Sequence, residues 1–265
     1  MQQIFSSYGY SITFFRITPS ELTNLLPPAN LDLSETAGIF CMELFHYEYC
    51  KMLSELGIPM LLIDGPVRTG SDPLPVDLLL MENSAGIYSF VMQLAEKGRK
   101  SVGFVGNMRH CRSFFERGST CLSTALVYGL LPAEQFSLLD YPPGTDNTRL
   151  LTYADHSNDL YSFLQSLPAL PDAFVCANDF IAINLISSLR RMNLSCPEDV
   201  LIMGFDDSPE SRFHSPSLST VHIHTQALGD LAAELLLSRI ADPDREPRTT
   251  YSYTDLILRE STRLD

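Results

Sequence analysis

The chain has 265 residues, of which 45% are hydrophobic and 19% are charged, and its 18 basic and 32 acidic side chains give a net charge of −14. This length fits one large domain or two smaller lobes, and the hydrophobic content supports a packed core, which excludes wholesale disorder. The negative charge argues against the chain holding a nucleic-acid phosphate backbone by itself. No hydrophobic run reaches the roughly 18 residues of a membrane span.

Strand-like apolar runs alternate with helical segments along the chain. Strands are predicted over 10–17, 35–41, 58–64, 76–81, 100–106, 137–141, 172–176, 200–205 and 219–223, with a final extended pair over 249–260. Helices are predicted over 43–57, 84–98, 113–129, 156–167, 180–194 and 225–240, with loops at 66–73 and 142–149. Apolar runs without alternation are typical of strands covered on both faces, so we expect an α/β fold with doubly wound parallel sheets.

The cysteines and the N-terminus bear on the cellular compartment. Six cysteines are scattered along the chain, with Cys41, Cys121, Cys176 and Cys196 in apolar or element-edge positions, so we expect free thiols in a reducing cytosol. The first 15 residues contain neither a basic region nor a small-residue cleavage site, so no signal peptide is expected. Together these features predict a cytoplasmic location.

The most informative stretch covers residues 171–221. Two apolar strands end in Asn178-Asp179 and in Asp206-Asp207, and a helical segment lies between them, which predicts a parallel βαβ unit. Because the carboxyl ends of such strands line the ligand crevice of an open α/β sheet, Asn178 and Asp206 are expected at one rim.

Several segments match a known family in the family's order. They are AGIF at 37–40, IPMLLID at 58–64, LAEKGRKSVGFVG at 94–106, PDAFVCANDFIA at 171–182, CPEDVLIMGFDD at 196–207, SPSLSTV at 215–221, LGDLAAELLLSRI at 228–240 and LILRESTR at 256–263. Over nearly its whole length the chain resembles the effector-binding core of the LacI/GalR transcriptional regulators, which have the type I periplasmic-binding-protein fold.

The resemblance implies two doubly wound lobes joined by three crossovers. The N-terminal lobe would contain residues 1–107 and 224–246, and the C-terminal lobe residues 108–223 and 247–265. The resemblance further implies a small-molecule effector, expected to be a sugar, bound between the lobes. Its binding would shift the lobe orientation, in a homodimer that does not contact a membrane.

The chain also departs from the family. A DNA-binding headpiece and the first core strand are absent from this sequence, so DNA binding is expected only through a headpiece outside it. We therefore expect an open sheet edge, with rearrangement, strand pairing or reduced stability in residues 1–60. Gly98-Arg99 stands where Gly-His is usual, and Glu82 where Asp is usual.

Asp206 and Asn178 are the first two candidate ligand-binding residues. Asp206 matches the family aspartate that accepts hydrogen bonds from ligand hydroxyl or amine groups, although a loop or capping role is the alternative. Asn178 matches a ligand-contacting amide and could instead cap the helix that follows. Asp207 is expected to be structural, because neighbouring side chains on an extended segment diverge.

Arg117 is the third candidate, because the family carries a ligand-binding arginine at this helix entry, and a guanidinium suits a hydroxyl-rich or carboxylate ligand. By spacing, Gly118 takes the expected place and Arg112 competes; a solvated surface arginine is the alternative. Ser84 is a further candidate, while Glu82 and Asn83 are expected to cap a helix. The aromatic candidates for a sugar-stacking wall, each equally compatible with the core, are Phe180, Phe205 and Tyr153.

The sequence contains no nucleophile elbow and no phosphate-binding glycine loop, so neither a catalytic residue nor a cofactor is expected. His222 and His224 share one strand face without a third ligand at suitable spacing, so no metal site is expected. The preferred function is the ligand-sensing core of a transcriptional regulator. The alternatives are an extracytoplasmic solute-binding protein of the same fold and an unrelated doubly wound enzyme.

Overall fold

The computed structural model describes residues 1–67, 74–130 and 153–263, with side chains in the last stretch described from residue 160. These residues form two compact units. The first unit contains Met1–Glu82, Cys111–Ser113 and His224–Tyr253. The second contains Asn83–His110, Phe114–Ile223 and Thr254–Asp265.

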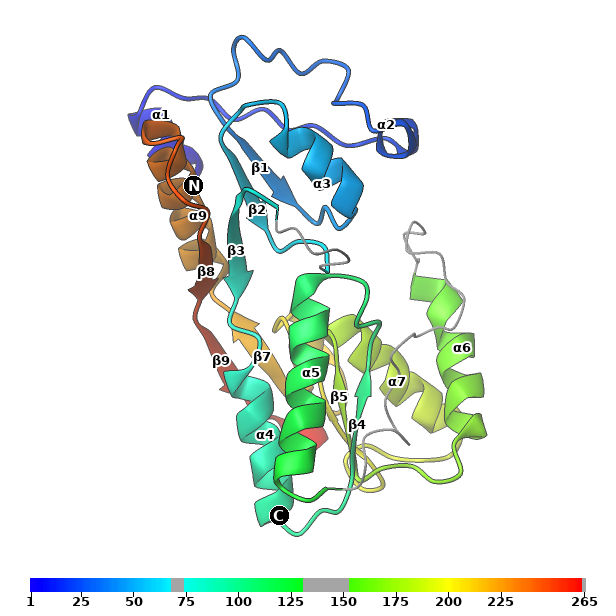
Figure 1. Ribbon diagram of the computed structural model, residues 1–265. Coiled ribbons are helices and arrows are strands. Elements are labelled where there is room, and N and C mark those ends of the chain that lie inside the picture. The colour runs from blue at the N-terminus through cyan, green and yellow to red at the C-terminus, as the bar shows by residue number, and fades with distance from the viewer. Residues whose placement is uncertain (68–73, 131–152, 264–265) are drawn as a thin grey trace. The chain divides into compact units, whose positions relative to one another are not determined.

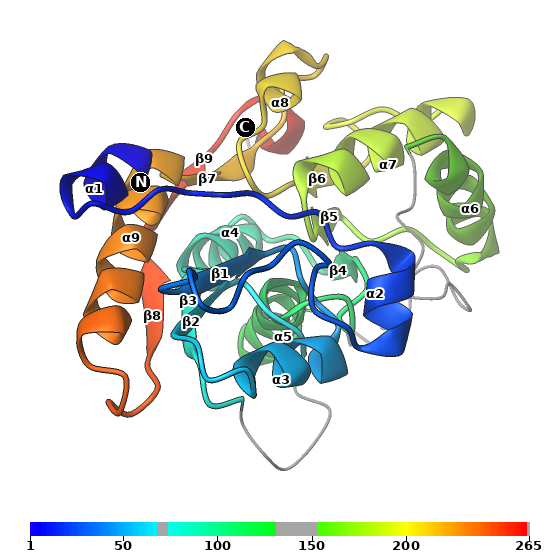
Figure 2. The same ribbon diagram turned by 90° about the horizontal axis from the view of Figure 1, so that it is seen from above.

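The first unit is built on a four-stranded parallel sheet in the order β1-β2-β3-β8 (Figure 1). Its strands are β1 (Ile39–Met42), β2 (Met60–Ile63), β3 (Asp77–Met81) and β8 (Thr249–Ser252). Its helices are α1 (Gln2–Ser7), α2 (Pro19–Asn24), α3 (Tyr47–Ser54) and α9 (Thr225–Ala241). Helices α9 and α1 pack on one face of the sheet, and α3 packs on the other (Figures 1 and 2).

Strand β2 explains how this sheet is covered on both faces. Leu61 packs with Leu236 of α9, whereas Met60 and Leu62 pack with Tyr49 of α3. Successive side chains of a strand point to opposite faces, so a continuous apolar run supplies two cores.

The second unit has a three-stranded parallel sheet in the order β4-β5-β6 and an antiparallel pair β7-β9. Its strands are β4 (Val102–Val105), β5 (Ala173–Cys176), β6 (Leu201–Met203), β7 (Thr220–Ile223) and β9 (Thr254–Ile257). Its helices are α4 (Ala85–Glu96), α5 (Arg112–Val127), α6 (Tyr153–Ser166), α7 (Asp179–Arg191), α8 (Pro209–Phe213) and the 3₁₀ turn Glu260–Thr262. Helices α4 and α5 pack on one face of the three-stranded sheet, and α6 and α7 pack on the other.

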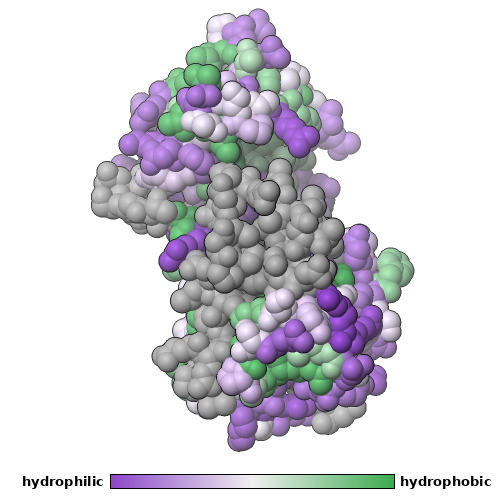
Figure 3. Space-filling model, turned by 90° about the vertical axis from the view of Figure 1, so that its right-hand side faces the viewer, coloured by the Kyte–Doolittle hydropathy of each residue, from purple (hydrophilic) through white to green (hydrophobic). Residues whose placement is uncertain are grey.

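The surface is mixed in polarity on the face that Figure 3 displays, where hydrophobic residues occur in small groups among hydrophilic ones. Within the described part of the chain, no helix is long and apolar enough to span a bilayer. All six cysteines are free thiols buried inside the protein, as expected. Burial raises the pKa of Cys41, Cys121 and Cys196 to about 12, which leaves these thiols unreactive at neutral pH.

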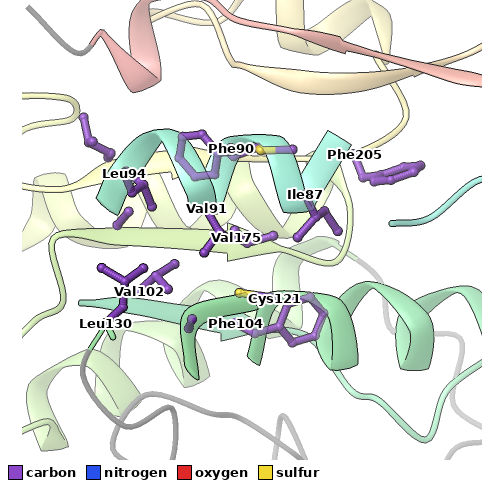
Figure 4. Close-up of a cluster of buried hydrophobic side chains, with 14 of the residues drawn as sticks. Ile87, Phe90, Val91, Leu94, Val102, Phe104, Cys121, Leu130, Val175 and Phe205 are labelled. Atoms are coloured by element: carbon purple, nitrogen blue, oxygen red, sulfur yellow. The ribbon is translucent and has the colours of Figure 1, made fainter. Parts of the chain in front are cut away.

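The core between α4, α5 and the β4-β5-β6 sheet assigns residues 83–107 to the second unit. Figure 4 shows Ile87, Phe90, Val91 and Leu94 of α4 packed with Val102, Phe104 and Val175 of the sheet, and all are buried. The units therefore divide at 82–83, 223–224 and 253–254, and the short stretch 111–113 groups with the first unit. The sequence-based division placed residues 83–107 in the first lobe and residues 247–253 in the second, whereas the structure places each with the other unit.

The prediction of an α/β fold with parallel sheets is confirmed. The βαβ unit forms from β5, α7 and β6, with Ala173 paired to Leu201 in parallel. The predicted strand at 137–141 and the loop at 142–149 lie outside the described residues, as does most of the loop at 66–73.

The predicted strand at 10–17 is wrong, because these residues belong to no strand in the structure. Phe14 is 77% exposed, while Tyr10 and Ile12 pack against the α9 side of the first unit and Ile17 against the α3 side. A strand requires a hydrogen-bonded neighbour. Among the described residues β1 pairs only with β2, so residues 10–17 have strand-forming side chains without a ladder.

Candidate ligand-binding site

Asp206 lies just beyond the carboxyl end of β6, as the βαβ reading predicts. Its backbone N–H donates to Val221 O at 2.9 Å, which ties the segment to β7. Its side chain is 36% exposed, so the carboxylate is partly open to solvent. The residues that follow β5 and β6 are also joined to each other, since Asp179 N–H donates to Phe205 O at 2.8 Å.

Arg117 of α5 lies beside this carboxylate. Its Nη1 is 3.7 Å from Asp206 Oδ1, although the arginine side chain is only 2% exposed. Nε donates to Asn83 Oδ1 at 2.9 Å, and Nη1 donates to Ala177 O at 2.7 Å. A buried charge requires such partners, so the guanidinium is fixed by one side-chain amide and one strand-end carbonyl.

Phe205 forms the platform beneath this arginine. The guanidinium carbon of Arg117 lies 3.5 Å from the ring centroid of Phe205 and 5.7 Å from that of Phe114. Phe205 is 1% exposed, so its ring packs against the cation as part of the core. The aromatic residue predicted as a sugar-stacking wall therefore supports the arginine.

Asn83 and Ser84 connect α4 to the same site. Asn83 is 1% exposed, and its Nδ2 donates to Glu116 Oε2 at 3.0 Å while its Oδ1 holds Arg117. Ser84 is the N-cap residue of α4, and its Oγ accepts a hydrogen bond from Thr120 at 3.2 Å. The sequence assigned Asn83 a capping role, so its part in orienting Arg117 was missed.

Asp207 is structural, as expected, and far more buried than Asp206. Its carboxylate is 4% exposed and accepts from Arg259 Nη2 at 2.5 Å, Arg212 Nη2 at 2.6 Å and His222 Nδ1 at 2.9 Å. Burial alone would raise the pKa of this carboxyl, but the arginine hydrogen bonds outweigh burial and lower the pKa to about 2. The group therefore stays ionised at neutral pH.

Asn178 caps the N-terminus of α7, the role given above as the alternative to ligand contact. Its Oδ1 accepts from the N–H of Ile181 at 2.9 Å at the start of α7. The adjacent Asp179 is fully buried and accepts from Thr220 Oγ1 at 2.6 Å. Burial raises the pKa of Asp179. Phe180, in the first turn of α7, is 37% exposed.

Arg112 and Gly118 are the two positions that competed with Arg117 in the sequence. Arg112 groups with the first unit, where its backbone N–H donates to Gly65 O at 2.8 Å. At Gly118 an added Cβ would lie 2.8 Å from the Met108 side chain, so a larger residue at this position requires Met108 to move. Tyr153 begins α6, and its side chain lies outside the described residues.

The arrangement offers a fixed cation and a partly exposed carboxylate side by side. A guanidinium donates hydrogen bonds and a carboxylate accepts them, so the pair can engage neighbouring hydroxyl groups of one ligand. Among the residues that the structure describes, no group of three or more histidine, cysteine, aspartate or glutamate side chains could hold a metal ion.

Comparison with known proteins identifies the family. Residues 91–262 match the periplasmic binding protein-like domain. A curated relative, the HTH-type transcriptional repressor PurR of Actinobacillus pleuropneumoniae serotype 3 (strain JL03), is 29% identical over 231 residues. The match covers 85% of this chain but only 63% of that repressor, so the chain spans less than two thirds of its relative.

Solved structures agree on the fold. A CelR transcriptional regulator in complex with cellobiose superposes with a TM-score of 0.79 at 22% identity, covering 98% of this chain and 76% of that one. A LacI family regulator from Enterococcus faecium with bound ribose gives 0.62 at 22% identity, covering 80% and 73%. These proteins are regulators and not enzymes, in line with the sequence-based expectation. The chain belongs to the periplasmic binding protein-like domain family, and it is similar to regulators of the LacI/GalR type.

Proposed function

We propose that this chain senses a small hydroxyl-rich ligand, a sugar, as the effector-binding core of a transcriptional regulator. One observation carries the proposal. The buried Arg117 guanidinium, held by Asn83 and Ala177, stands 3.7 Å from the partly exposed Asp206 carboxylate. Such a preorganised donor and acceptor suits vicinal hydroxyls, since neither side chain must be immobilised when the ligand binds.

The relatives support the sugar as ligand class and regulation as the role. One structural neighbour is a complex with cellobiose, another contains ribose, and the curated relative is a repressor. Regulation requires a ligand that binds two conformations of the protein with different affinities, because only that difference shifts their equilibrium. Within this proposal the protein works in the cytoplasm as a homodimer, and contact with DNA is made by a headpiece outside this sequence. Because these relatives are named as transcriptional regulators, we favour a regulatory role over that of a solute-binding protein.

A thermal-shift screen tests the proposal. The unmodified chain is heated with D-ribose, cellobiose, a nucleobase and an amino acid. A binding sugar at 100 times its dissociation constant should add about 2.7 kcal/mol to the free energy of unfolding. The Asp206→Ala variant should lose that stabilisation, because the acceptor for the ligand hydroxyls is gone.

The Glu198→Ala variant is the matched control, since Glu198 is an exposed carboxylate of the same unit outside the site. It should keep the full shift. A shift produced by the nucleobase or the amino acid and by neither sugar would contradict the sugar assignment. An equal sugar shift with and without Asp206 would remove this site from the proposal.

A further inference from the structure

Asp206 and Asp207 adopt an unusual backbone conformation. Their φ angles are 114° and 53°, and both are non-glycine residues. The value at Asp206 lies far outside the small left-handed region near 57° that L-residues tolerate. Such a conformation persists only where surrounding contacts enforce it, and it clusters at ligand sites.

The contacts that enforce it converge on Asp207. Its carboxylate binds Arg259 from the C-terminal segment, Arg212 from α8 and His222 from β7, at 2.5, 2.6 and 2.9 Å. Arg259 is anchored in turn, because its Nη1 donates to Leu218 O at 2.8 Å. Three separate segments therefore hold one side chain.

Backbone hydrogen bonds also hold the residues on both sides of Asp207. The N–H of Asp207 donates to Thr220 Oγ1 at 3.2 Å, and that of Ser208 to Asp179 Oδ2 at 2.7 Å. The N–H of Asp206 donates to Val221 O at 2.9 Å. Asp206 is thus fixed through its backbone, while its own carboxylate remains 36% exposed, against 4% for Asp207.

We propose that Asp207, Arg259, Arg212 and His222 form a positioning clamp that holds Asp206 in its strained conformation, so that its carboxylate is presented beside Arg117. Asp207 and its partners are positioning residues that act through Asp206. The inference rests on the proposed function for its ligand, but the clamp itself can be tested without one.

The test compares glycine with alanine at position 206. Both Asp206→Gly and Asp206→Ala remove the carboxylate, and only glycine relieves the positive φ. The Asp206→Gly variant should melt about 2–4 °C above the Asp206→Ala variant. When Asp207→Asn is also present, the backbone at residue 206 can relax, so the difference in melting temperature between the glycine and alanine variants should fall by at least half. A double-mutant cycle measures this change.

The same comparison in a Glu198→Ala background is the control and should retain the full difference in melting temperature. If Asp207→Asn does not fold, Arg212→Met replaces it, since that arginine is 53% exposed and its removal is milder. The proposal is overturned if the glycine and alanine variants differ as much in melting temperature with Asp207→Asn as without it. It is also overturned if the two variants melt at the same temperature when Asp207 is present.

Binding provides a second readout. Where D-ribose or cellobiose binds the unmodified chain, Asp207→Asn should weaken the affinity about tenfold, and Glu198→Ala should leave it unchanged. Unaltered sugar affinity in the Asp207→Asn variant overturns the positioning role. Failure of both sugars to bind bears on the proposed function alone, because the glycine–alanine comparison then decides the clamp.

Discussion

At Asp207, burial and ion pairing act on one carboxyl in opposite directions. Burial disfavours its ionised form, whereas Arg212, Arg259 and His222 favour it, and the arginines prevail. Because the pKa in the folded protein is about 2, below the ordinary 3.8, this group stabilises the fold at pH values above about 4. That stabilisation is lost as the pH falls through about 2.

The Asp207→Asn variant should therefore be less stable than the unmodified chain at pH 5, and the difference should shrink by about 2 kcal/mol on acidification to pH 2. Urea unfolding at a series of pH values measures it, with Glu198→Gln as the control for an exposed carboxylate. A difference that stays constant from pH 5 to pH 2 would show that the carboxylate charge is not what the arginines bind.

At the scale of elements, the two sheets differ in how well their backbones are protected. Every residue of β5 is fully buried and β5 pairs with β4 and β6. Strand β1 pairs with β2 alone among the described strands, and residues 10–17 are in no strand. Backbone groups outside a ladder exchange with solvent through small local openings.

Amide hydrogen exchange should accordingly be fastest at residues 10–17, intermediate in β1 and slowest in β5. Exchange followed residue by residue by NMR measures the order. Protection of residues 10–17 equal to that of β5 would mean that this segment forms a ladder in solution. The Phe14→Ser variant should leave the order unchanged, because Phe14 is already 77% exposed.

The strands and the helix of the βαβ unit could be predicted because the hydrophobic pattern of the sequence agrees there with the burial of the side chains. The run AFVC at 173–176 is apolar throughout since β5 is covered on both faces, and its partner VLIMGF behaves alike. At residues 10–17 the β-branched and aromatic side chains led to a wrong strand prediction, because β propensity describes side chains and not the presence of a neighbouring strand.

The site was predictable where residues follow strand ends and less so where they are brought from elsewhere. Asp206 was found from its place after β6. Asn83 was missed as the partner of Arg117, because 34 residues separate them and only the tertiary packing of α4 on α5 joins them. The same holds for Arg259 and Asp207, which lie 52 residues apart.

At the scale of the whole molecule, charge sets what the chain can bind unaided. With 18 basic against 32 acidic side chains, the net charge is −14. Affinity for duplex DNA comes largely from releasing counterions with clustered Lys and Arg. Electrophoretic mobility of a duplex should therefore be unchanged by micromolar amounts of this chain, even at about 50 mM salt, where such binding is much stronger than at about 200 mM. Retention of the duplex that weakens with added salt would contradict the prediction.

The bond from Arg117 to the carbonyl of Ala177 has a consequence for how this protein can change over evolutionary time. The N–H of Ala177 still pairs with Val105, so Arg117 supplies the donor for a carbonyl just past the end of β5. Losing the arginine would leave that carbonyl and Asn83 Oδ1 without this partner in a buried place, at a cost of about 1–3 kcal/mol each. A descendant that no longer needed its ligand would still be selected to keep Arg117 for folding. Retention of this arginine among relatives is therefore weak evidence of a shared ligand, and the partly exposed Asp206 is the residue whose variation should follow ligand choice.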